Sequence, residues 1–414
     1  MGYSRKYCLL IALKVAICLT PEEVAPQTTV VWRDVSPIIA RSCIRCHQPN
    51  MSAPMSLMTY QDARPWAAAI KRAVVSRAMP PWFAADGVVR FKNDPRLRDD
   101  EIETIVKWVD GGAQSVGESS VQALAPSQGV WSIGEPDTVF VSDRVDVPPD
   151  GVVAYQYLRI AIGVPSDKWI QGLEIRAENQ TVVHHVIATA NKLGDVRHLR
   201  QAFNSGIQLG GYAAGGSGIL YQPGVARLLP AGADIFLQVH YTPDGQRRTD
   251  RLFVAVKWAR ERPLAQALSV GVINNTFVIP PHTQNYAVSA SRTLPTDVEV
   301  IALMPHMHLR GRSMRYTAYL PGGQAITILD VPNFEFGWQL TYELERPLRL
   351  PSGTRLEVLA HFDNSAGNRR NPDPKSSVRW GEQSWEEMMV GWLTVTKRVQ
   401  VPALTKMLEF FGVK

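Results

Sequence analysis

The spacing of hydrophobic and polar positions changes near residue 130, and this change divides the chain into two unlike parts. Before it, apolar residues recur every three to four positions, as on one face of an α-helix. The helices predicted from this spacing are residues 35–40, 67–75 and 99–109. The last of them should end at Gly111-Gly112, because glycine is common at helix ends. Residues 31–117 are therefore predicted to form a small helical unit.

After residue 130, apolar and polar residues alternate in short runs separated by Gly, Pro and Asp, a pattern typical of half-buried β-strands. The predicted strands are residues 137–141, 155–162, 169–176, 182–189, 235–241, 251–258, 298–304, 314–319, 355–361 and 389–397. So many short strands predict two jelly-roll-like β-sandwich domains, at residues 130–263 and 264–414. Residues 118–129, rich in Ser and Ala, are predicted to be the linker, and the glycine-rich residues 210–216 a flexible loop.

The composition agrees with a globular protein of several domains. The chain has 414 residues, of which 45% are hydrophobic and 20% charged, enough for more than one core. Its net charge of +6 is modest and is not gathered into a basic run. Nucleic-acid binding is therefore not expected.

Residues 1–27 have the features of a secretory signal peptide. Arg5 and Lys6 precede an apolar stretch over residues 8–19, which is too short to span a bilayer. Lys14 interrupts this stretch, so an uncleaved N-terminal anchor is the alternative. The protein is expected to be periplasmic or secreted, with no stable membrane span after cleavage.

Cys43-Ile-Arg-Cys46-His47 is a C-x-x-C-H motif. In such a motif two thiols add to the vinyl groups of a haem, and the adjacent histidine coordinates its iron. The other two of the four cysteines lie within the predicted signal peptide, so the mature chain would contain no disulfide. The motif predicts that residues 31–117 are a cytochrome c-like domain with one covalently attached haem c.

A methionine sulfur is the expected second axial ligand of this haem. The candidates after the motif are Met51, Met55, Met58 and Met79. Met79 is favoured because it precedes Pro80-Pro81, a rigid turn that could hold its thioether over the iron. The other methionines are assigned to packing around the porphyrin. A haem with two axial ligands has no open position, so we expect it to transfer electrons and not to activate oxygen.

Five histidines of the β-rich part fall into patterns that suit metal binding. His306 and His308 lie two apart on a predicted strand and therefore point to the same face, unless both simply face solvent. His184 and His185 are adjacent, so they can share a metal only at a twist, a bulge or a strand end. His240 lies opposite the apolar face of its own strand and supplies a third imidazole.

Histidines with a thioether favour copper, because imidazole suits both oxidation states and sulfur stabilises Cu(I). Met388 precedes the predicted strand at residues 389–397 and is the candidate sulfur. Zinc is the competing metal for a group of three histidines. It cannot change its oxidation state, so it would have no use for electrons from a haem.

Four stretches together resemble the copper type II, ascorbate-dependent monooxygenases, the family of peptidylglycine alpha-hydroxylating monooxygenase and dopamine beta-monooxygenase. The resemblance is greatest to bacterial members that carry an N-terminal cytochrome c domain. The stretches, in the family's order, are residues 183–185, 237–241, 306–311 and 386–388. The resemblance covers residues 130–397 and implies two copper ions. The implied ligands are His184, His185 and His240 for one copper and His306, His308 and Met388 for the other.

The resemblance also implies a reaction and its partners. The three-histidine copper would store an electron, and the methionine-bearing copper would bind O2 and hydroxylate a C–H bond of a small molecule. The family's two sandwiches face each other across a solvent-filled cleft. Electrons from an ascorbate-like reductant or a redox protein would enter through the haem.

The chain departs from the peptide-hydroxylating member of the family around the substrate. That enzyme has an arginine two residues before its His-x-His pair, where this chain has Met304. After the methionine ligand it has an asparagine and a tyrosine, where this chain has Val390 and Trp392. These positions predict an apolar or aromatic substrate in place of a peptidyl-glycine. His361 is a candidate for a supporting position beside the catalytic copper.

Two other classes of function compete with this interpretation. A haem- and copper-containing protein for electron transfer or copper binding would need no substrate of its own. Absence of His306, His308 or Met388 would have favoured that class, and all three residues are present. A zinc hydrolase would need a general base beside an open zinc position, and the sequence shows no such pattern.

Overall fold

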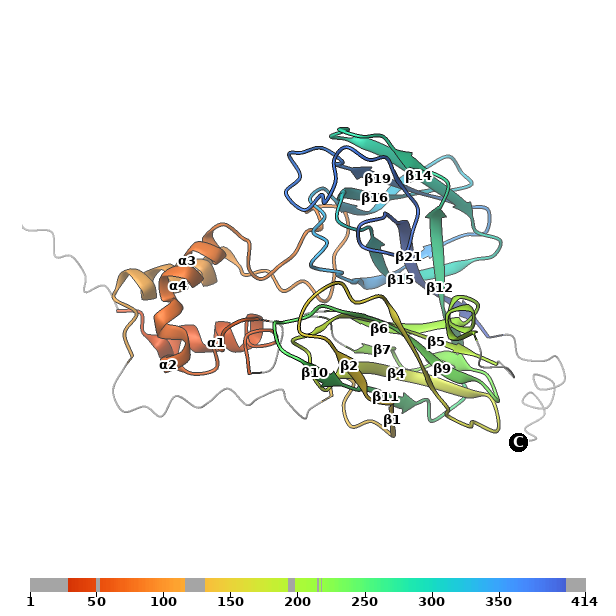
Figure 1. Ribbon diagram of the computed structural model, residues 1–414, viewed down its shortest axis with the longest axis horizontal. Helices are drawn as coiled ribbons and strands as arrows, with labels where there is room; N and C mark the ends of the chain where they lie inside the picture. The colour runs from red at the N-terminus through yellow and green to blue at the C-terminus, as the bar shows by residue number, and fades with distance from the viewer. Residues whose placement is uncertain are drawn as a thin grey trace, which may run out of the picture.

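The computed structural model of the chain describes residues 29–49, 53–115, 131–192, 198–213, 216 and 218–399. These residues are mostly β-sheet, with a small helical unit on one side (Figure 1). The predicted signal peptide and the predicted linker lie outside the described residues. None of the described helices is long and apolar enough to cross a bilayer.

A small apolar core holds the helical unit together. Its helices are α1 (Trp32–Ser42), α2 (Tyr60–Ala63), the 3-10 helix η1 (Arg64–Trp66), α3 (Ala67–Val75) and α4 (Asp99–Asp110). The rings of Trp32 and Trp108 lie 5.5 Å apart, and Val35, Ile39 and Ile105 are buried around them. All three helices predicted from the apolar spacing are present, and the first is longer than its pattern indicated.

The middle of the chain forms two sheets that enclose one core. Its elements are β1 (Thr138–Val141), β2 (Val145–Val147), β3 (Gln156–Ile160), β4 (Lys168–Ala177), β5 (Val183–Asn191), α5 (Leu199–Asn204), β6 (Ile207–Ala213), β7 (Ile219–Leu220), β8 (Val225–Leu229), β9 (Asp234–Tyr241), β10 (Arg248–Asp250) and β11 (Leu252–Trp258). The sheet β3-β9-β5-β6 packs on β1-β11-β4-β8. Ile175, Val186, Leu237 and Val254 are buried between the two sheets.

The last part of the chain repeats this arrangement. Its strands are β12 (Ala265–Asn274), β13 (Val278–Ile279), β14 (Tyr286–Thr293), β15 (Val298–His306), β16 (Gly311–Tyr319), β17 (Ala325–Val331), β18 (Tyr342–Leu350), β19 (Arg355–Phe362), β20 (Val378–Arg379) and β21 (Met389–Arg398). The sheet β14-β19-β16-β17 packs on β12-β21-β15-β18. Leu303, Tyr316, Val358 and Leu393 are buried between them.

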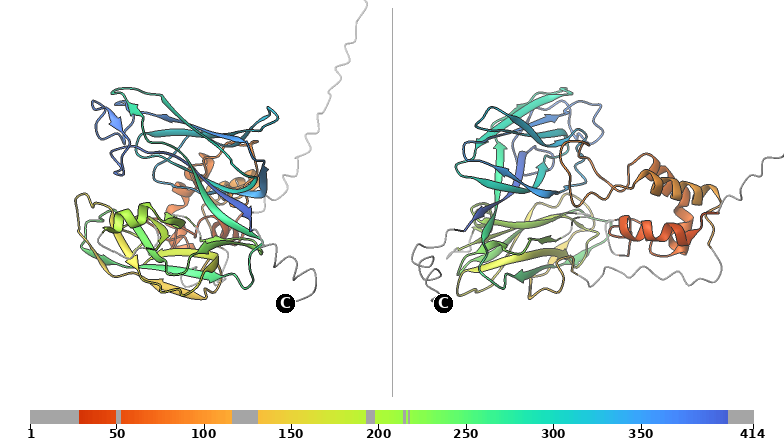
Figure 2. Two further views of the ribbon diagram at one scale, coloured as in Figure 1. Left: turned by 90° about the vertical axis from the view of Figure 1, so that its right-hand side faces the viewer. Right: turned by 180° about the vertical axis from the view of Figure 1, so that it is seen from behind.

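The two sandwiches share one sheet. Strand β8 pairs in parallel with β12, where Val225 lies opposite Ala265, and this pairing makes a nine-stranded sheet. The buried guanidinium of Arg227 strengthens the junction, since it donates to the carbonyl of Gln208 on β6 and to Ser269 Oγ on β12. Figure 2 shows the two sandwiches one above the other. Both sandwiches are therefore joined by backbone pairing as well as by side chains.

Residues 82–94 depart from the prediction that residues 31–117 form one helical unit. They lie between α3 and α4 in the sequence, yet Ala84 belongs to the core of the second sandwich. Trp82 and Phe91 pack against the same core. The segment lacks a helical period, and its partly buried aromatic side chains pack against the sandwich instead of within the helical core.

The glycine-rich segment also differs from the prediction. Residues 207–213 form the strand β6, which pairs with β5, so the predicted loop is wrong for residues 210–213. A Cβ atom at Gly211 would lie 2.8 Å from the carbonyl oxygen of Val186. Glycine is therefore needed here because the two backbones approach so closely.

Candidate metal centres

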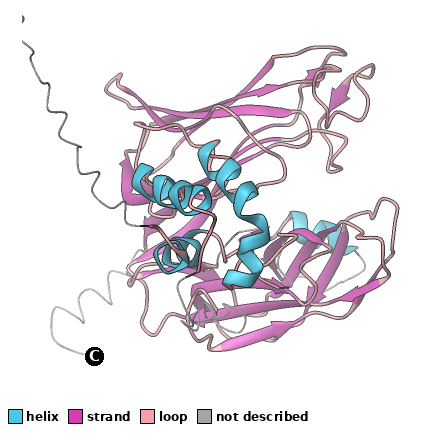
Figure 3. Cartoon of the chain, turned by 90° about the vertical axis from the view of Figure 1, so that its left-hand side faces the viewer, coloured by secondary structure: helices cyan, strands magenta, loops and turns pink. Residues whose placement is uncertain are grey.

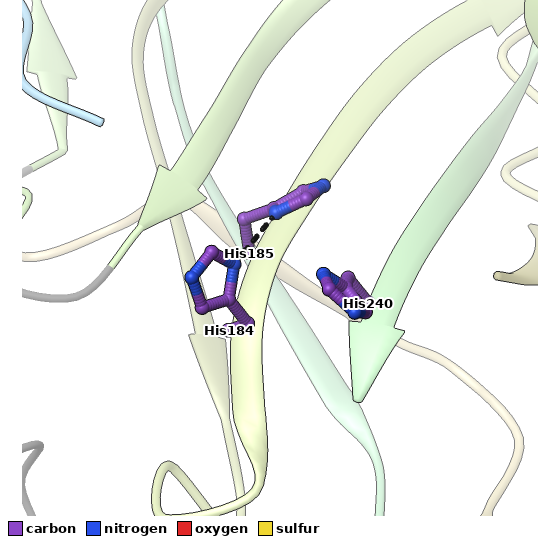
Figure 4. A group of neighbouring side chains, drawn as sticks. All are labelled: His184, His185 and His240. Carbon is purple, nitrogen blue, oxygen red and sulfur yellow. Dashed lines mark hydrogen bonds between the residues drawn. The ribbon is translucent and has the colours of Figure 1, made fainter. Parts of the chain in front are cut away.

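Three histidines of the first sandwich gather where β5 and β9 lie side by side, and their rings turn toward one another (Figure 4). Val183 lies opposite Tyr241, but His185 lies opposite His240, so His184 is the extra residue of a β-bulge. The bulge is the irregularity that two adjacent histidines need in order to share a metal. One ring nitrogen of each histidine lies within 4.8 Å of those of the other two.

The ring nitrogens of this group suit a metal ion. The Nδ1 atoms of His184 and His185 are 3.0 Å apart, and Nδ1 of His240 is buried without a hydrogen-bond partner among the described residues. Burial lowers the pKa of all three imidazoles, that of His240 to about 4. They are therefore neutral near pH 7, which is the protonation state that binds metals.

His306 ends β15, and His308 follows two residues later. Their rings are 5.2 Å apart and nearly perpendicular, at 89°. Nδ1 of His306 is 3.0 Å from Gln339 Oε1, and Nδ1 of His308 is 3.3 Å from the carbonyl oxygen of Glu386. These contacts engage Nδ1 of each ring and thereby orient both imidazoles. Burial lowers the pKa of His308 to about 3, so this ring is also neutral.

Glu387 stabilises the backbone around His308. Its carboxylate is fully buried and accepts the backbone N–H groups of His308 (2.8 Å) and Arg310 (2.6 Å). The guanidinium of Arg310 is buried as well and donates to Asn364 Oδ1 (2.8 Å) and to the carbonyl of Trp385 (2.9 Å). This network connects the loop after β15 with the segment that precedes β21.

Met388 lies directly after Glu387 and before β21. Val390, which is buried, pairs with His306 across β15 and β21. The ring of His308 lies beside the segment just before Met388, since its Nδ1 is 3.3 Å from the carbonyl oxygen of Glu386. The predicted thioether ligand and the predicted histidine pair thus come from neighbouring chain segments of the second sandwich.

The two histidine groups face each other at the junction of the sandwiches. Phe336, in the loop between β17 and β18, stacks on His184 with ring centres 5.2 Å apart and planes at 23°. Its ring centre is also 6.0 Å from that of His308. The resemblance implied a solvent-filled cleft at this place. In the structure an aromatic ring stands between the two groups.

Polar contacts also hold the sandwiches together near the histidines. Glu382, shortly before Met388, accepts a hydrogen bond from Tyr157 Oη (3.1 Å) and pairs with the guanidinium of Arg200 (2.8 Å). Tyr157 and Arg200 belong to β3 and α5 of the first sandwich. The segment that carries Met388 is therefore anchored to the opposite sandwich.

A cavity of about 200 Å³ lies beside both histidine groups, and His185 and His306 line it. Met304 and Trp392, which lie opposite each other on β15 and β21, form part of its wall. Cys46 of the haem motif lines it as well. Residues singled out in the sequence for the haem, for the metals and for the substrate therefore meet at one cavity.

The haem motif begins where α1 ends. The backbone N–H groups of Cys46 and His47 both donate to the carbonyl of Cys43, at 3.1 and 3.0 Å. Nδ1 of His47 is 3.3 Å from the carbonyl oxygen of Met55, which leaves its Nε2 available for iron. Neither thiol forms a disulfide. Two thiols beside an oriented imidazole fit the attachment of a haem.

The structure gives the positions of Met79 and His361, but these positions do not test the roles predicted for the two residues. Met79 follows α3, and the next residue, Pro80, lines the same cavity as Cys46. Nδ1 of His361 is 3.1 Å from Ser313 Oγ, a contact between β19 and β16. The roles of Met79 as an axial ligand and of His361 beside the copper stay predictions.

Sequence reasoning missed Phe336 and Gln339. Both lie in the loop before β18; Gln339 is 33 residues from His306, and Phe336 is 152 residues from His184. A single Phe or Gln in a loop has no periodic or motif signal. Only the fold brings these residues to the site.

Two groups of neutral imidazoles lie beside one cavity, and neutral imidazole is the form of histidine that coordinates metals. The chain is similar to DBH-like monooxygenase protein 1 from Gallus gallus, at 25% identity over 238 residues. It is similar to the protein of the same name from Homo sapiens, at 23% identity over 229 residues. Each match covers 49% of this chain and 36% of the relative, so it spans about a third of the relative's length. No family model matches the chain.

Solved structures add no argument. The major capsid protein P2 from Bacteriophage PM2 has a TM-score of 0.27 and 7% identity, over 63% of this chain and 99% of that chain. An allantoicase structure has a TM-score of 0.16 and 11% identity, over 53% of this chain and 79% of that chain. Scores this low support no inference about fold or function.

Proposed function

We propose that the chain is a copper-dependent monooxygenase that uses O2 to hydroxylate a C–H bond of a small organic molecule. The observation that carries the proposal is the pair of histidine groups that face each other beside one cavity. The similarity to DBH-like monooxygenase proteins supports the reaction class. Its substrate, O2 and a reductant would be the partners of the reaction.

We assign one copper ion to each histidine group. Copper at these positions supplies one-electron redox chemistry, and imidazole and thioether ligands suit both of its oxidation states. The assigned ligands are His184, His185 and His240 for the first copper and His306, His308 and Met388 for the catalytic copper. The unpartnered Nδ1 of His240 and the Nδ1 contacts that orient His306 and His308 support this assignment.

Other residues of the chain orient the ligands and shape the substrate site. Gln339 holds the ring of His306, and Glu387 holds the backbone of His308. Met304 and Trp392 present apolar surface to the cavity that His306 lines. An apolar or aromatic substrate fits such a wall better than a charged peptide terminus, because burying an unpaired charge is costly.

We assign Cys43 and Cys46 to the covalent attachment of one haem c, with His47 and Met79 as axial ligands. The haem would supply one-electron transfer from an ascorbate-like reductant or a redox protein. In this respect the chain corresponds to the bacterial form of the family with an N-terminal cytochrome c domain. A periplasmic or secreted location follows from the same proposal, together with the predicted signal peptide.

Oxygen uptake by the copper-loaded, haem-containing chain tests the function. We expect uptake that depends on a reductant and on an apolar substrate, with one atom of labelled O2 found in the hydroxylated product. His306→Ala should abolish product formation while the haem absorption spectrum is unchanged. The matched control is His198→Ala, at an exposed position.

Two results would overturn the proposal. Hydroxylation that survives in His306→Ala would refute the catalytic site. Bound copper without hydroxylation of any aromatic or aliphatic compound in a broad panel would instead favour an electron-transfer or copper-binding protein.

A further inference from the structure

Residues 82–94, here called the docking strap, extend the sheet of the second sandwich. Phe91 forms a β-bridge with Leu344 on β18, which is the outermost strand of the nine-stranded sheet. The N–H of Lys92 donates to the carbonyl of Glu343, and the N–H of Glu345 donates to a carbonyl in the strap, both at 2.9 Å. The strap therefore satisfies backbone groups that an exposed edge strand would leave unpaired.

Side chains reinforce this pairing. Nδ2 of Asn93 donates to the carbonyl of Thr341 (2.7 Å), and its Oδ1 accepts the N–H of Glu343 (3.0 Å). The ammonium group of Lys92 lies 2.6 Å from the Glu343 carboxylate. The side-chain amide of Asn93 thus bonds to two residues of the second sandwich, to one through its nitrogen and to the other through its oxygen.

An aromatic cluster completes the contact. The ring centre of Trp82 lies 4.8 Å from that of Tyr342 and 5.7 Å from that of Phe91. The ring centres of Tyr342 and Phe91 are 5.5 Å apart. Such ring pairs add to the stability gained from burial. The strap is therefore fixed to the sandwich by backbone, polar and aromatic contacts together.

The strap determines which residues of the helical unit face the sandwiches. Trp82, at its start, and Pro81, just before it, line the cavity together with Cys46. The same cavity is lined by His185 of the first sandwich and His306 of the second. Figure 3, which looks from the helical unit toward the sandwiches, shows the helices in front of their junction. Cys46 thus opens onto the space that both histidine groups share.

We propose that the helical unit is a fixed wall of the active-site cavity, and that the strap holds the haem-bearing Cys46 edge there. A substrate in the cavity would then touch the haem edge on one side and the surroundings of His306 on the other. This inference rests on the proposed function, since it needs both haem and copper. The alternative that this inference excludes is a helical unit that moves on its linker between a distant electron donor and the copper sites.

Pulsed EPR on the full-length chain tests this inference, with ferric haem and with Cu(II) loaded at both histidine groups. We expect a narrow distribution of haem-to-copper distances in the unsubstituted protein. The double variant Trp82→Ala/Asn93→Ala should lose the narrow distribution while its haem and copper contents per chain are unchanged. Lys107→Ala, on the exposed face of α4, is the matched control and should retain it.

A second measurement uses indole as an apolar aromatic probe. Its binding should shift both the haem absorption spectrum and the Cu(II) EPR signal in the unsubstituted protein, and only the copper signal in the double variant. If the double variant does not fold, Asn93→Ala alone is measured and should broaden the distances.

Failure of this inference differs from failure of the proposed function. A broad distance distribution in a fully loaded, unsubstituted protein would overturn the fixed wall and leave the copper sites intact. A narrow distribution that survives in the folded strap variants would overturn the role of the strap. Absence of any Cu(II) signal from the histidine groups would instead refute the proposed function.

Discussion

At the residue scale, the candidate metal ligands depend on neighbours that bind no metal. Gln339 orients His306, and Glu387 holds the backbone of His308. Such supporting hydrogen bonds fix the direction of an imidazole and thereby its affinity for a metal. The ligands themselves could be predicted, because strand parity and the spacing of the histidines constrain which face they share. Gln339 could not be predicted, because it lies in a loop 33 residues from His306, whereas Glu387 directly precedes the predicted ligand Met388.

Glu387→Ala should destabilise the second sandwich. It leaves the backbone N–H groups of His308 and Arg310 buried without an acceptor, at a cost of about 2–4 kcal/mol in the free energy of unfolding. Glu387→Gln keeps one acceptor oxygen and should lose less. Urea unfolding of the copper-free chain measures both variants.

Glu103→Ala, at an exposed position on α4, provides the reference and should change stability by less than about 0.5 kcal/mol. If Glu387→Ala unfolded at the same urea concentration as this reference, the buried carboxylate would have no structural role.

At the element scale, alternation predicted ten strands and missed others, among them β6, β12, β14, β17 and β18. All ten predicted strands are present, with ends shifted by a few residues. Strand β18 was missed because it is rich in charged residues and contains Pro347, as suits a strand at the edge of a sheet. Strand β6 was missed because its glycines resemble a loop, although they allow the close approach to β5.

Gly211→Ala should therefore be destabilising. The added Cβ would lie 2.8 Å from the carbonyl oxygen of Val186, so β5 and β6 would have to move apart. Overpacking of this kind costs about 1–3 kcal/mol. Gly322→Ala is the matched control, since a Cβ there meets nothing within 4 Å. Equal melting temperatures for the two variants would show that the β5–β6 contact is not as tight as described.

At the scale of the whole molecule, three parts that the sequence suggested as separate domains are closely joined. The pairing of Val225 with Ala265 unites the two sandwiches, and that of Phe91 with Leu344 attaches the helical unit. Pairings between residues so distant in sequence produce no periodic signal, so a single sequence could not reveal them. In the joined molecule, Cys46 lines the same cavity as His185 and His306.

The copper content of the purified, fully loaded protein tests the account most directly. We predict two copper ions per chain for the unsubstituted protein and for His198→Ala. His240→Ala and His308→Ala should each retain one, because each removes a ligand from a different group. One copper ion or none in the unsubstituted protein would contradict the account of two metal centres.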